Sequence, residues 1–199
     1  LSPPESAMHK IVLRDHRLGE HRILPGAAML EMALQAARLA APGRRATELR
    51  DVRWHKAIAV DADPTPIRIA LSPERDTVRF ELYAGNDDVR TLHAQGAIAF
   101  EDDARAVAES DERLDLAAIR GRCRTVERAD IDAAFAAMGF AFGESFRVFE
   151  RLHHNNDEAL AELRLPPVAG VRHDVFALPP ALLDGALRTS LGIGGLAAS

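Results

Sequence analysis

The sequence contains little cysteine and no recognisable pattern of metal ligands. Its single cysteine, Cys123, excludes an internal disulfide framework and a zinc site built from cysteines. The eight histidines are scattered along the chain, and only His153 and His154 are adjacent. No H-E-x-x-H pattern occurs. The sequence therefore gives no support for a metal site.

Long apolar runs and an excess of positive charge are also lacking. No apolar run approaches the roughly 20 residues that span a bilayer, and no charged leader precedes an apolar stretch with a cleavage site. The net charge of -5 provides no basic surface for nucleic acid or for an anionic membrane. We therefore expect neither a nucleic-acid nor a membrane partner, and we expect the reducing cytoplasm as the compartment.

What is present is the composition of an ordinary globular protein. Of the 199 residues, 47% are hydrophobic and 28% are charged. This length suits one large domain or two small ones. The sequence begins with Leu1, and its first methionine is Met8, so we expect an excised piece of a longer polypeptide.

The N-terminal half predicts one unusually apolar helix. Residues 9–16 are typical of a strand that runs into a sharp turn. The helix then follows from Gly26 to Ala41, because Pro25 suits a helix start and Pro42-Gly43 ends the pattern. Its polar side chains form one narrow stripe: Glu31, Gln35 and Arg38. A helix this apolar needs to be wrapped by other elements, usually a curved sheet.

The sheet is predicted directly after this helix. Alternating apolar residues and strand-forming composition indicate strands at 50–60, 67–71, 78–82 and 91–100, with a turn at 85–88. One buried helix followed by antiparallel strands is an α+β pattern, in which a sheet curls round a helix. Residues 101–128 are acidic and rich in alanine, and we predict a linker with some helix there.

The same order of elements returns in the C-terminal half. The pattern predicts a helix at 131–138, strands at 146–152 and 159–165, and a second apolar helix at 181–191. This second copy ends soon after its helix, so either the strands that would wrap the helix are left out of this sequence or the second half is not a repeat of the first. We therefore predict a first unit at 1–100, a linker at 101–128 and a truncated second unit at 129–199.

A histidine precedes the first apolar helix in a position that suits acid–base chemistry. His16 lies on a turn before the helix N-terminus, where backbone N–H groups lack partners and the helix dipole is positive. A thioester carbonyl that rests on those N–H groups could gain enolate character, and a nearby histidine could remove the acidified α-proton. The alternative is that His16 only caps the turn. His21 competes for the role, but its neighbour Arg22 favours a solvated position.

An aspartate lies within the second apolar helix. Asp184 is surrounded in sequence by alanine, leucine and glycine, and a carboxylate buried there requires a reason. One reason is catalysis, since desolvation adapts a carboxyl group to the role of general acid. The other is an ion pair within the helix, because Arg188 lies four residues further on the same face. The sequence leaves both interpretations open.

Three segments together resemble the dehydratase domains of modular polyketide synthases. Asp15-His16 through Pro25-Gly26 is similar to their H-x-x-x-G-x-x-x-x-P motif, and Leu182 through Arg188 is similar to L-D-x-x-x-Q or L-D-x-x-x-H. Between them, Gly139 through Phe146 resembles G-Y-x-Y-G-P-x-F. Leu49–Trp54 and His93–Gly96 also resemble this family, especially its trans-acyltransferase branch. The likeness covers residues 9–193.

The resemblance implies an α+β double hotdog, in which two curved antiparallel sheets each wrap round a buried helix. It implies that His16 acts as base and Asp184 as acid on a 3-hydroxyacyl chain carried by the phosphopantetheine arm of an acyl carrier protein. Water then leaves and a 2-enoyl thioester remains, without a metal or organic cofactor. Other synthase domains and a second copy in a homodimer are further implied partners. The implied substrate-binding residues are Glu20, Pro25, Gly26, Phe142, Gly143 and Arg188.

Four departures from the family pattern bear on activity. Glu20 stands where the first motif has glycine, and its side chain crowds the turn, although Gly19 beside it could adopt the required backbone. In the segment that resembles G-Y-x-Y-G-P-x-F, Phe142 replaces the second tyrosine and lacks its hydroxyl, and Glu144 replaces the proline. The fourth departure, Arg188, replaces a neutral glutamine or histidine.

Arg188 bears on the chemistry in one of two ways. A cation one turn from Asp184 favours the carboxylate form, which opposes proton donation. Alternatively, Arg188 donates to the leaving hydroxyl or orients Asp184. The competing functions are accordingly a dehydratase, a related domain that shifts a double bond or closes an oxygen (pyran) ring, and a catalytically silent scaffold.

Overall fold

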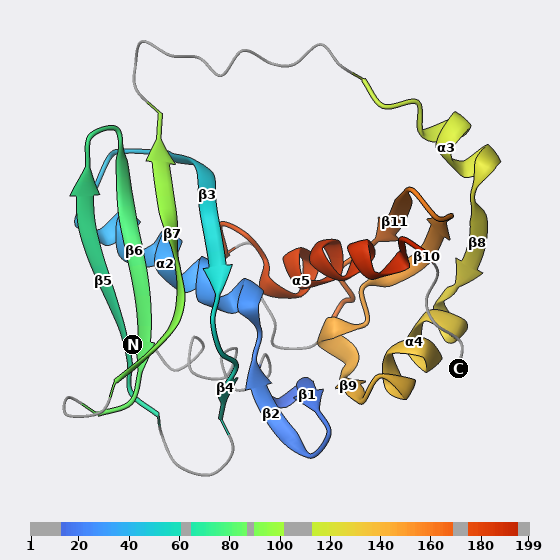
Figure 1. Ribbon diagram of the computed structural model, residues 1–199, viewed down its shortest axis with the longest axis horizontal. Coiled ribbons are helices and arrows are strands. Elements are labelled where there is room, and N and C mark those ends of the chain that lie inside the picture. Colours follow the sequence, from blue (N-terminus) through green and yellow to red (C-terminus); the bar gives the residue numbers. More distant parts are fainter. Residues whose placement is uncertain (1–12, 61–64, 87–89, 102–112, 169–174, 195–199) are drawn as a thin grey trace. The chain divides into compact units, whose positions relative to one another are not determined.

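The computed structural model describes residues 13–60, 65–86, 90–101, 113–168 and 175–194 (Figure 1). Internal contacts divide the chain into two units. Unit 1 contains the described parts of Leu1–Arg22 and Glu112–Ser199, and unit 2 contains the described parts of Ile23–Asp111. The two units are described separately below.

Unit 2 is an antiparallel sheet with one long helix. Its sheet has the strand order β3-β7-β6-β5, with every neighbouring pair antiparallel. The four strands are β3 (Ala46–Trp54), β5 (Ile67–Glu74), β6 (Thr77–Ala84) and β7 (Thr91–Phe100). Beside them, the short strand β4 (Ile58–Ala59) pairs with the end of β2 (His21–Leu24). Strands are confirmed at the predicted ranges 67–71, 78–82 and 91–100. The single strand predicted at 50–60 is wrong, because β3 ends at Trp54 and β4 is a separate strand.

Helix α2 (Gly26–Ala40) contacts all four strands of this sheet (Figure 1). Apart from Glu31, its buried side chains are small or apolar, and they meet a sheet face on which Phe80, Leu82 and Ile98 are fully buried. Burial of this apolar area is the main force that holds helix and sheet together. Within the predicted polar stripe, buried Glu31 accepts a hydrogen bond from Gln35 over 2.6 Å.

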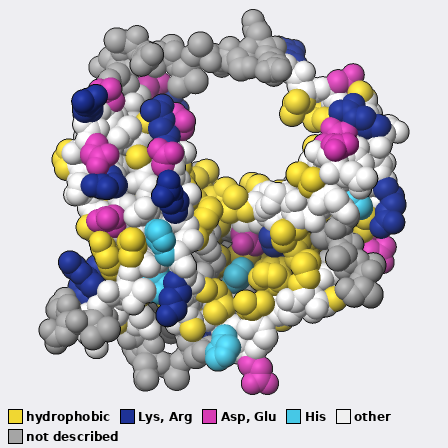
Figure 2. All heavy atoms as spheres, viewed as in Figure 1, with side chains coloured by type: hydrophobic (Ala, Val, Ile, Leu, Met, Phe, Trp, Pro, Cys, Tyr) yellow, Lys and Arg dark blue, Asp and Glu magenta, His cyan; other side chains and the backbone are white. Residues whose placement is uncertain are grey.

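Charged side chains of both signs cover the strands of unit 2. Figure 2 shows Lys or Arg and Asp or Glu side chains intermixed over this part of the visible face. Arg79 and Glu74, for example, pair over 3.0 Å on neighbouring strands, and both are about half exposed. Exposed pairs of this kind contribute little to stability, so the unit owes most of its stability to the apolar contact with α2.

The described part of unit 1 combines short strands with helices. Its sheet β11-β10-β8 consists of β8 (Arg124–Glu127), β10 (Phe149–His154) and β11 (Ala159–Leu163). Strand β1 (His16–Leu18) pairs with β2 and with β9 (Phe140–Phe142). The helices are α3 (Leu116–Arg122), α4 (Arg128–Ala137) and α5 (Pro180–Thr189), with 3-10 turns η1 (Glu144–Phe146) and η3 (Ser190–Gly192).

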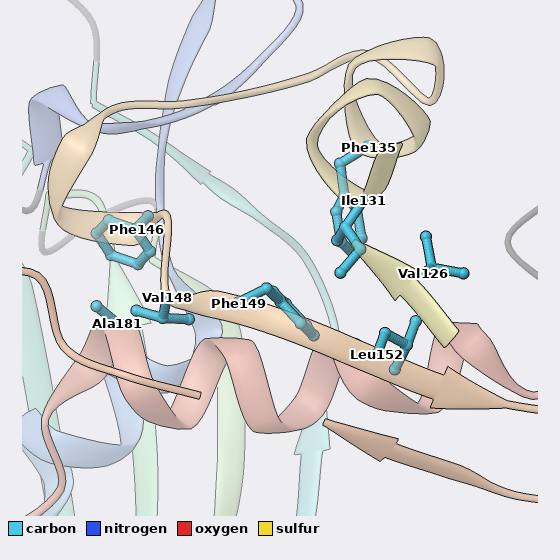
Figure 3. Close-up of a cluster of buried hydrophobic side chains, with 8 residues drawn as sticks. All are labelled: Val126, Ile131, Phe135, Phe146, Val148, Phe149, Leu152 and Ala181. Carbon is cyan, nitrogen blue, oxygen red and sulfur yellow. The ribbon is translucent and has the colours of Figure 1, made fainter. Parts of the chain in front are cut away.

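The core of unit 1 joins its sheet to α4 and α5 (Figure 3). Phe135 and Ile131 point from α4 towards Phe149 on β10, while Phe146 lies at the η1 end of the same cluster. The full cluster is Val126, Ile131, Phe135, Phe146, Val148, Phe149, Leu152 and Ala181. Because these residues are all buried, the cluster fixes the elements that carry the candidate site.

The predicted α+β double-hotdog class is confirmed, while several element predictions need correction. Leu13 and Arg14 are helical, and a strand begins only at His16, so the strand predicted for 9–16 is wrong in its described part. The predicted linker contains a strand, β8, in addition to α3. Parts of 9–16, of the turn at 85–88 and of the linker lie outside the described residues. The predicted boundaries 1–100, 101–128 and 129–199 remain a prediction.

Candidate active site

The backbone around His16 is fixed on two sides. Strand β1 pairs with β9 in a register that places His16 opposite Phe142. On its other side, β1 turns back into β2 through Gly19, whose φ of 59° is the left-handed conformation that favours glycine. The Gly19 N–H also donates to the Gly139 carbonyl over 2.8 Å. Gly19 therefore provides the left-handed turn residue. This agrees with the prediction that Gly19 takes over the turn because Glu20 occupies the position of the motif glycine.

The imidazole of His16 is buried among aromatic rings. Its side chain is 9% exposed. The ring centroid lies 5.4 Å from that of Phe142 and 5.2 Å from that of Phe146, in tilted and edge-on arrangements. Such walls limit the rotamers of the imidazole and exclude water from it.

Helix α5 supplies the second candidate group. Asp184 lies in the middle of α5, with its side chain 12% exposed. Its Oδ1 is 3.6 Å from Nε2 of His16. Close packing of the helix makes this approach possible, because Gly185 has no Cβ to displace Val148. The structure therefore brings together the two residues that the sequence predicts as base and acid.

Arg188 joins the same group. Its Nε donates to Oδ2 of Asp184 over 2.7 Å, and its Nη2 donates to the Phe146 carbonyl over 3.0 Å. Its guanidinium also lies 4.0 Å from the centre of the Phe142 ring. Burial lowers the pKa of Arg188, and the opposite charge of Asp184 counteracts this only in part. The predicted ion pair within the helix is thus present together with the contact to His16.

This arrangement divides the two oxygens of Asp184 between two tasks. Oδ2 accepts from Arg188, and Oδ1 faces His16. A proton that Asp184 donates must therefore leave from Oδ1, on the side of the imidazole. A nitrogen base and a carboxyl oxygen 3.6 Å apart can reach substituents on two adjacent carbon atoms of one substrate.

Asp15 and Ser145 also belong to this site, although no sequence motif indicates a functional role for either. The buried Asp15 carboxylate accepts from the Ser145 N–H over 3.1 Å and from Ser145 Oγ over 2.8 Å. Burial alone would raise the pKa of Asp15, but hydrogen bonds from Arg14 and Ser145 outweigh it and hold that pKa below its ordinary value. No local sequence signal points to this pair, because the two residues lie 130 positions apart.

Two further predicted residues of unit 1 lie in this group, and one lies in the β1–β2 turn. Phe142 forms one wall of His16. Gly143 has no room for a side chain, since a Cβ there would overlap the Asp15 carboxylate. Glu20 is exposed in the turn after β1, and its predicted substrate contact remains a prediction. His21, the competing histidine, is exposed on β2.

Pro25 and Gly26 belong to unit 2, where Gly26 has a structural role of its own. Pro25 precedes the first residue of α2 as its N-cap. The Trp54 indole donates to the Gly26 carbonyl over 3.2 Å, and a Cβ on Gly26 would overlap the indole ring. The predicted contacts of Pro25 and Gly26 with substrate remain predictions.

The described residues contain no cluster of three or more side chains that could hold a metal ion. Among these residues, no helix is long and apolar enough to cross a membrane.

Two family descriptions match the chain in succession. The polyketide synthase dehydratase domain matches residues 6–85, and the polyketide synthase dehydratase N-terminal domain matches residues 111–195. The polyketide synthase PksM of Bacillus subtilis is 32% identical over 190 residues, and ThaG of Burkholderia thailandensis is 36% identical over 192 residues. These matches cover 90% and 92% of the chain but only 4% and 3% of the two synthases.

Solved structures of polyketide synthase dehydratase domains have a similar fold. A trans-AT PKS dehydratase domain from Brevibacillus brevis superposes with a TM-score of 0.81 at 32% identity, covering 93% of this chain and 66% of that one. The dehydratase domain from the CurF module of curacin polyketide synthase has a TM-score of 0.76 at 22% identity, over 89% of this chain and 64% of its own. At that identity, the second likeness concerns the fold alone.

Proposed function

Because the chain belongs to the polyketide synthase dehydratase family, as a domain of the trans-AT branch, we propose that it removes water from a 3-hydroxyacyl thioester on an acyl carrier protein. The observation that carries the proposal is the approach of His16 Nε2 to Asp184 Oδ1 at 3.6 Å, with both side chains buried. A buried base beside a buried carboxyl group is the minimum that an acid–base elimination requires.

The proposed reaction needs only these two side chains. His16 removes a proton from C2, the carbon next to the thioester, and Asp184 protonates the hydroxyl on C3. The C3–O bond then breaks, water leaves, and the electron pair forms the C2=C3 bond of a 2-enoyl thioester. The aromatic walls around His16 support this chemistry, because a water-poor site strengthens electrostatic interactions and protects the enolate-like intermediate.

The proposal includes the setting of the reaction. The acyl carrier protein delivers the substrate on its phosphopantetheine arm, and no metal or organic cofactor takes part. The other domains of a parent synthase and a second copy of the domain are the remaining proposed partners, and the cytoplasm is the proposed compartment. The matches to short stretches of PksM and ThaG support an origin within a larger synthase.

A second candidate reaction is double-bond migration in an enoyl thioester. The observation that favours it is the contact of Arg188 with Asp184 Oδ2 over 2.7 Å, which occupies one of the two carboxyl oxygens that could serve as the acid. Migration requires only one base, which takes a proton from C4 and returns one to C2, and it releases no water. His16 could perform both steps.

Intact-mass spectrometry distinguishes the two candidates. A carrier protein, or a pantetheine mimic, is loaded with a short 3-hydroxyacyl group of either configuration and incubated with wild type, His16→Ala and Asp184→Asn. The proposal predicts a loss of water with wild type and none with either variant. If no water is lost for either configuration or for several chain lengths, dehydration is wrong. Enoyl substrates then test double-bond migration and ring closure by proton NMR, because neither reaction changes the mass, and inactivity in all assays indicates a scaffold.

A further inference from the structure

The loop from Gly143 to Phe146 contacts the backbone next to His16 through polar groups as well as rings. The Gly143 N–H donates to the Asp15 carbonyl over 2.8 Å. Two residues later, the N–H and the hydroxyl of Ser145 both donate to Oδ2 of Asp15. Three hydrogen bonds from this loop therefore converge on the residue directly before His16, in addition to the one from Arg14.

The contact of Asp15 with Gly143 and Ser145 is buried and tightly packed. Asp15 and Ser145 are 4% and 2% exposed, so few other partners are accessible to them. A Cβ at position 143 would overlap the Asp15 carboxylate, and the φ of Gly143, -75°, suits any residue. Glycine at 143 is therefore required by the approach of the carboxylate rather than by backbone conformation.

His16 depends on this contact because its own strand is short. Strand β1 has only three residues, and His16 is its first, next to the end of a ladder where pairing is weakest. The pairing with Phe142 fixes one side of His16. The bonds to Asp15 fix the chain immediately before it, and Phe146 of the same loop packs on the imidazole.

We infer that Asp15 and Ser145 are positioning residues that hold His16 at its working distance from Asp184. This inference rests on the proposed dehydration for its kinetic consequence, but its structural part can be measured separately. A carboxylate is the appropriate group, because hydrogen bonds to a charged acceptor are shorter and about twice as strong as neutral ones. The Ser145 pair with Asp15 spans 130 positions of sequence, and it extends the connection between the two segments beyond the last ladder pair, His16 with Phe142.

Kinetics of Asp15→Ala and Ser145→Ala test the inference. Asp15→Ala removes both Ser145 bonds, and we expect kcat to fall roughly 10- to 100-fold, since small displacements of a catalytic group have effects of this size. Ser145→Ala removes only the hydroxyl bond and is expected to lower kcat about ten-fold. KM should stay unchanged in both, because neither residue binds substrate in this account.

Thr125→Ala is the matched control. It deletes a hydroxyl contact to Nδ1 of His153, 3.0 Å long, elsewhere in unit 1. We expect it to alter thermal stability without changing kcat. If Asp15→Ala fails to fold, Ser145→Ala carries the test.

The NMR spectrum of His16 gives a readout that does not depend on turnover. The Hε1 resonance, assigned by comparison with His16→Ala, should shift or broaden in Asp15→Ala and Ser145→Ala and remain unchanged in Thr125→Ala. If both kcat and this resonance stay as in wild type while only the melting temperature falls, the inference is wrong. If wild type does not dehydrate any substrate, the proposed function fails, and the resonance alone decides whether the pair positions His16.

Discussion

At the residue scale, the proposed chemistry depends most on Asp184, whose two oxygens face different partners. Oδ1 faces His16, and Oδ2 accepts from Arg188. The guanidinium is stabilised in turn by the Phe146 carbonyl and by the faces of Phe142, Phe135 and Phe149. A buried pair held in this way does not primarily serve stability, because desolvation of two charges offsets their attraction.

Replacement of Arg188 tests this account of the pair. Arg188→Met should lower the free energy of unfolding by about 3–5 kcal/mol, because it leaves a buried carboxylate without its cation. The double variant Asp184→Leu with Arg188→Met should recover most of that loss and show no dehydration. Urea denaturation measures the first effect, and the mass assay measures the second. A double variant as unstable as Arg188→Met would contradict the account.

His154 is a second residue with an energetic consequence. It is buried, and both of its ring nitrogens lack a hydrogen-bond partner in the described structure. Burial lowers the pKa of His154, with a further contribution from Arg124. The unfolded chain therefore binds a proton at this residue more readily than the folded chain does.

The free energy of unfolding should consequently depend on pH through the protonation of His154. The contribution of His154 is complete above the pKa of an unfolded histidine, about 6.5, and is lost as the pH falls from there through the lowered folded pKa. His154→Leu should raise stability by about 1 kcal/mol at neutral pH, since it removes an unsatisfied buried group. The substitution should also make the loss of stability below a pH of about 6.5 less steep. Urea unfolding at a series of pH values decides, and parallel curves for wild type and variant would refute the prediction.

At the element scale, the position of α5 depends on the contact between Gly185 and Val148. Alanine at 185 would improve helix propensity by about 1 kcal/mol, but its Cβ would overlap a methyl group of Val148. The packing of the helix, and not its propensity, determines where Asp184 lies. This also explains why an apolar helix with a central glycine is stable here.

A pair of substitutions separates propensity from packing. Gly185→Ala alone should destabilise the protein by about 1–3 kcal/mol through overpacking and lower the dehydration rate by displacing Asp184. In the double variant with Val148→Ala, the methyl group of alanine at 185 has space. This variant should be more stable than the summed destabilisation of the two single variants predicts. Thermal unfolding of wild type, the two single variants and the double variant completes a double-mutant cycle. Strict additivity would show that the two residues do not compete for the same space.

The elements that sequence patterns predicted best are those with long apolar periodicity. Helix α2 and strand β7 follow the predicted ranges closely, because the apolar side chains of α2 and the alternation of β7 are unambiguous. Strands β8 and β9 are four and three residues long, too short to show a period. Their pairing partners are distant in sequence, so only the folded chain defines them.

At the scale of the whole molecule, the candidate site joins residues that are distant in sequence, His16 and Asp184, within unit 1. Residues before 23 and after 111 form one contact unit, whereas the segment between them forms the other. Motif spacing indicated His16 and Asp184, and it also indicated Arg188 as a neighbour on the helix face. It could not indicate Asp15 with Ser145, because a contact across 130 positions has no local signature.

The removal of the α-proton by His16 is the central claim, and isotope labelling tests it most directly. A 3-hydroxyacyl pantetheine with two deuterium atoms on C2 is followed by mass spectrometry with wild type and with His16→Ala. We expect wild type to release water together with one deuterium, more slowly than from the unlabelled substrate, and His16→Ala to do neither. Water loss with both deuterium atoms retained, or undiminished loss in His16→Ala, would contradict the account.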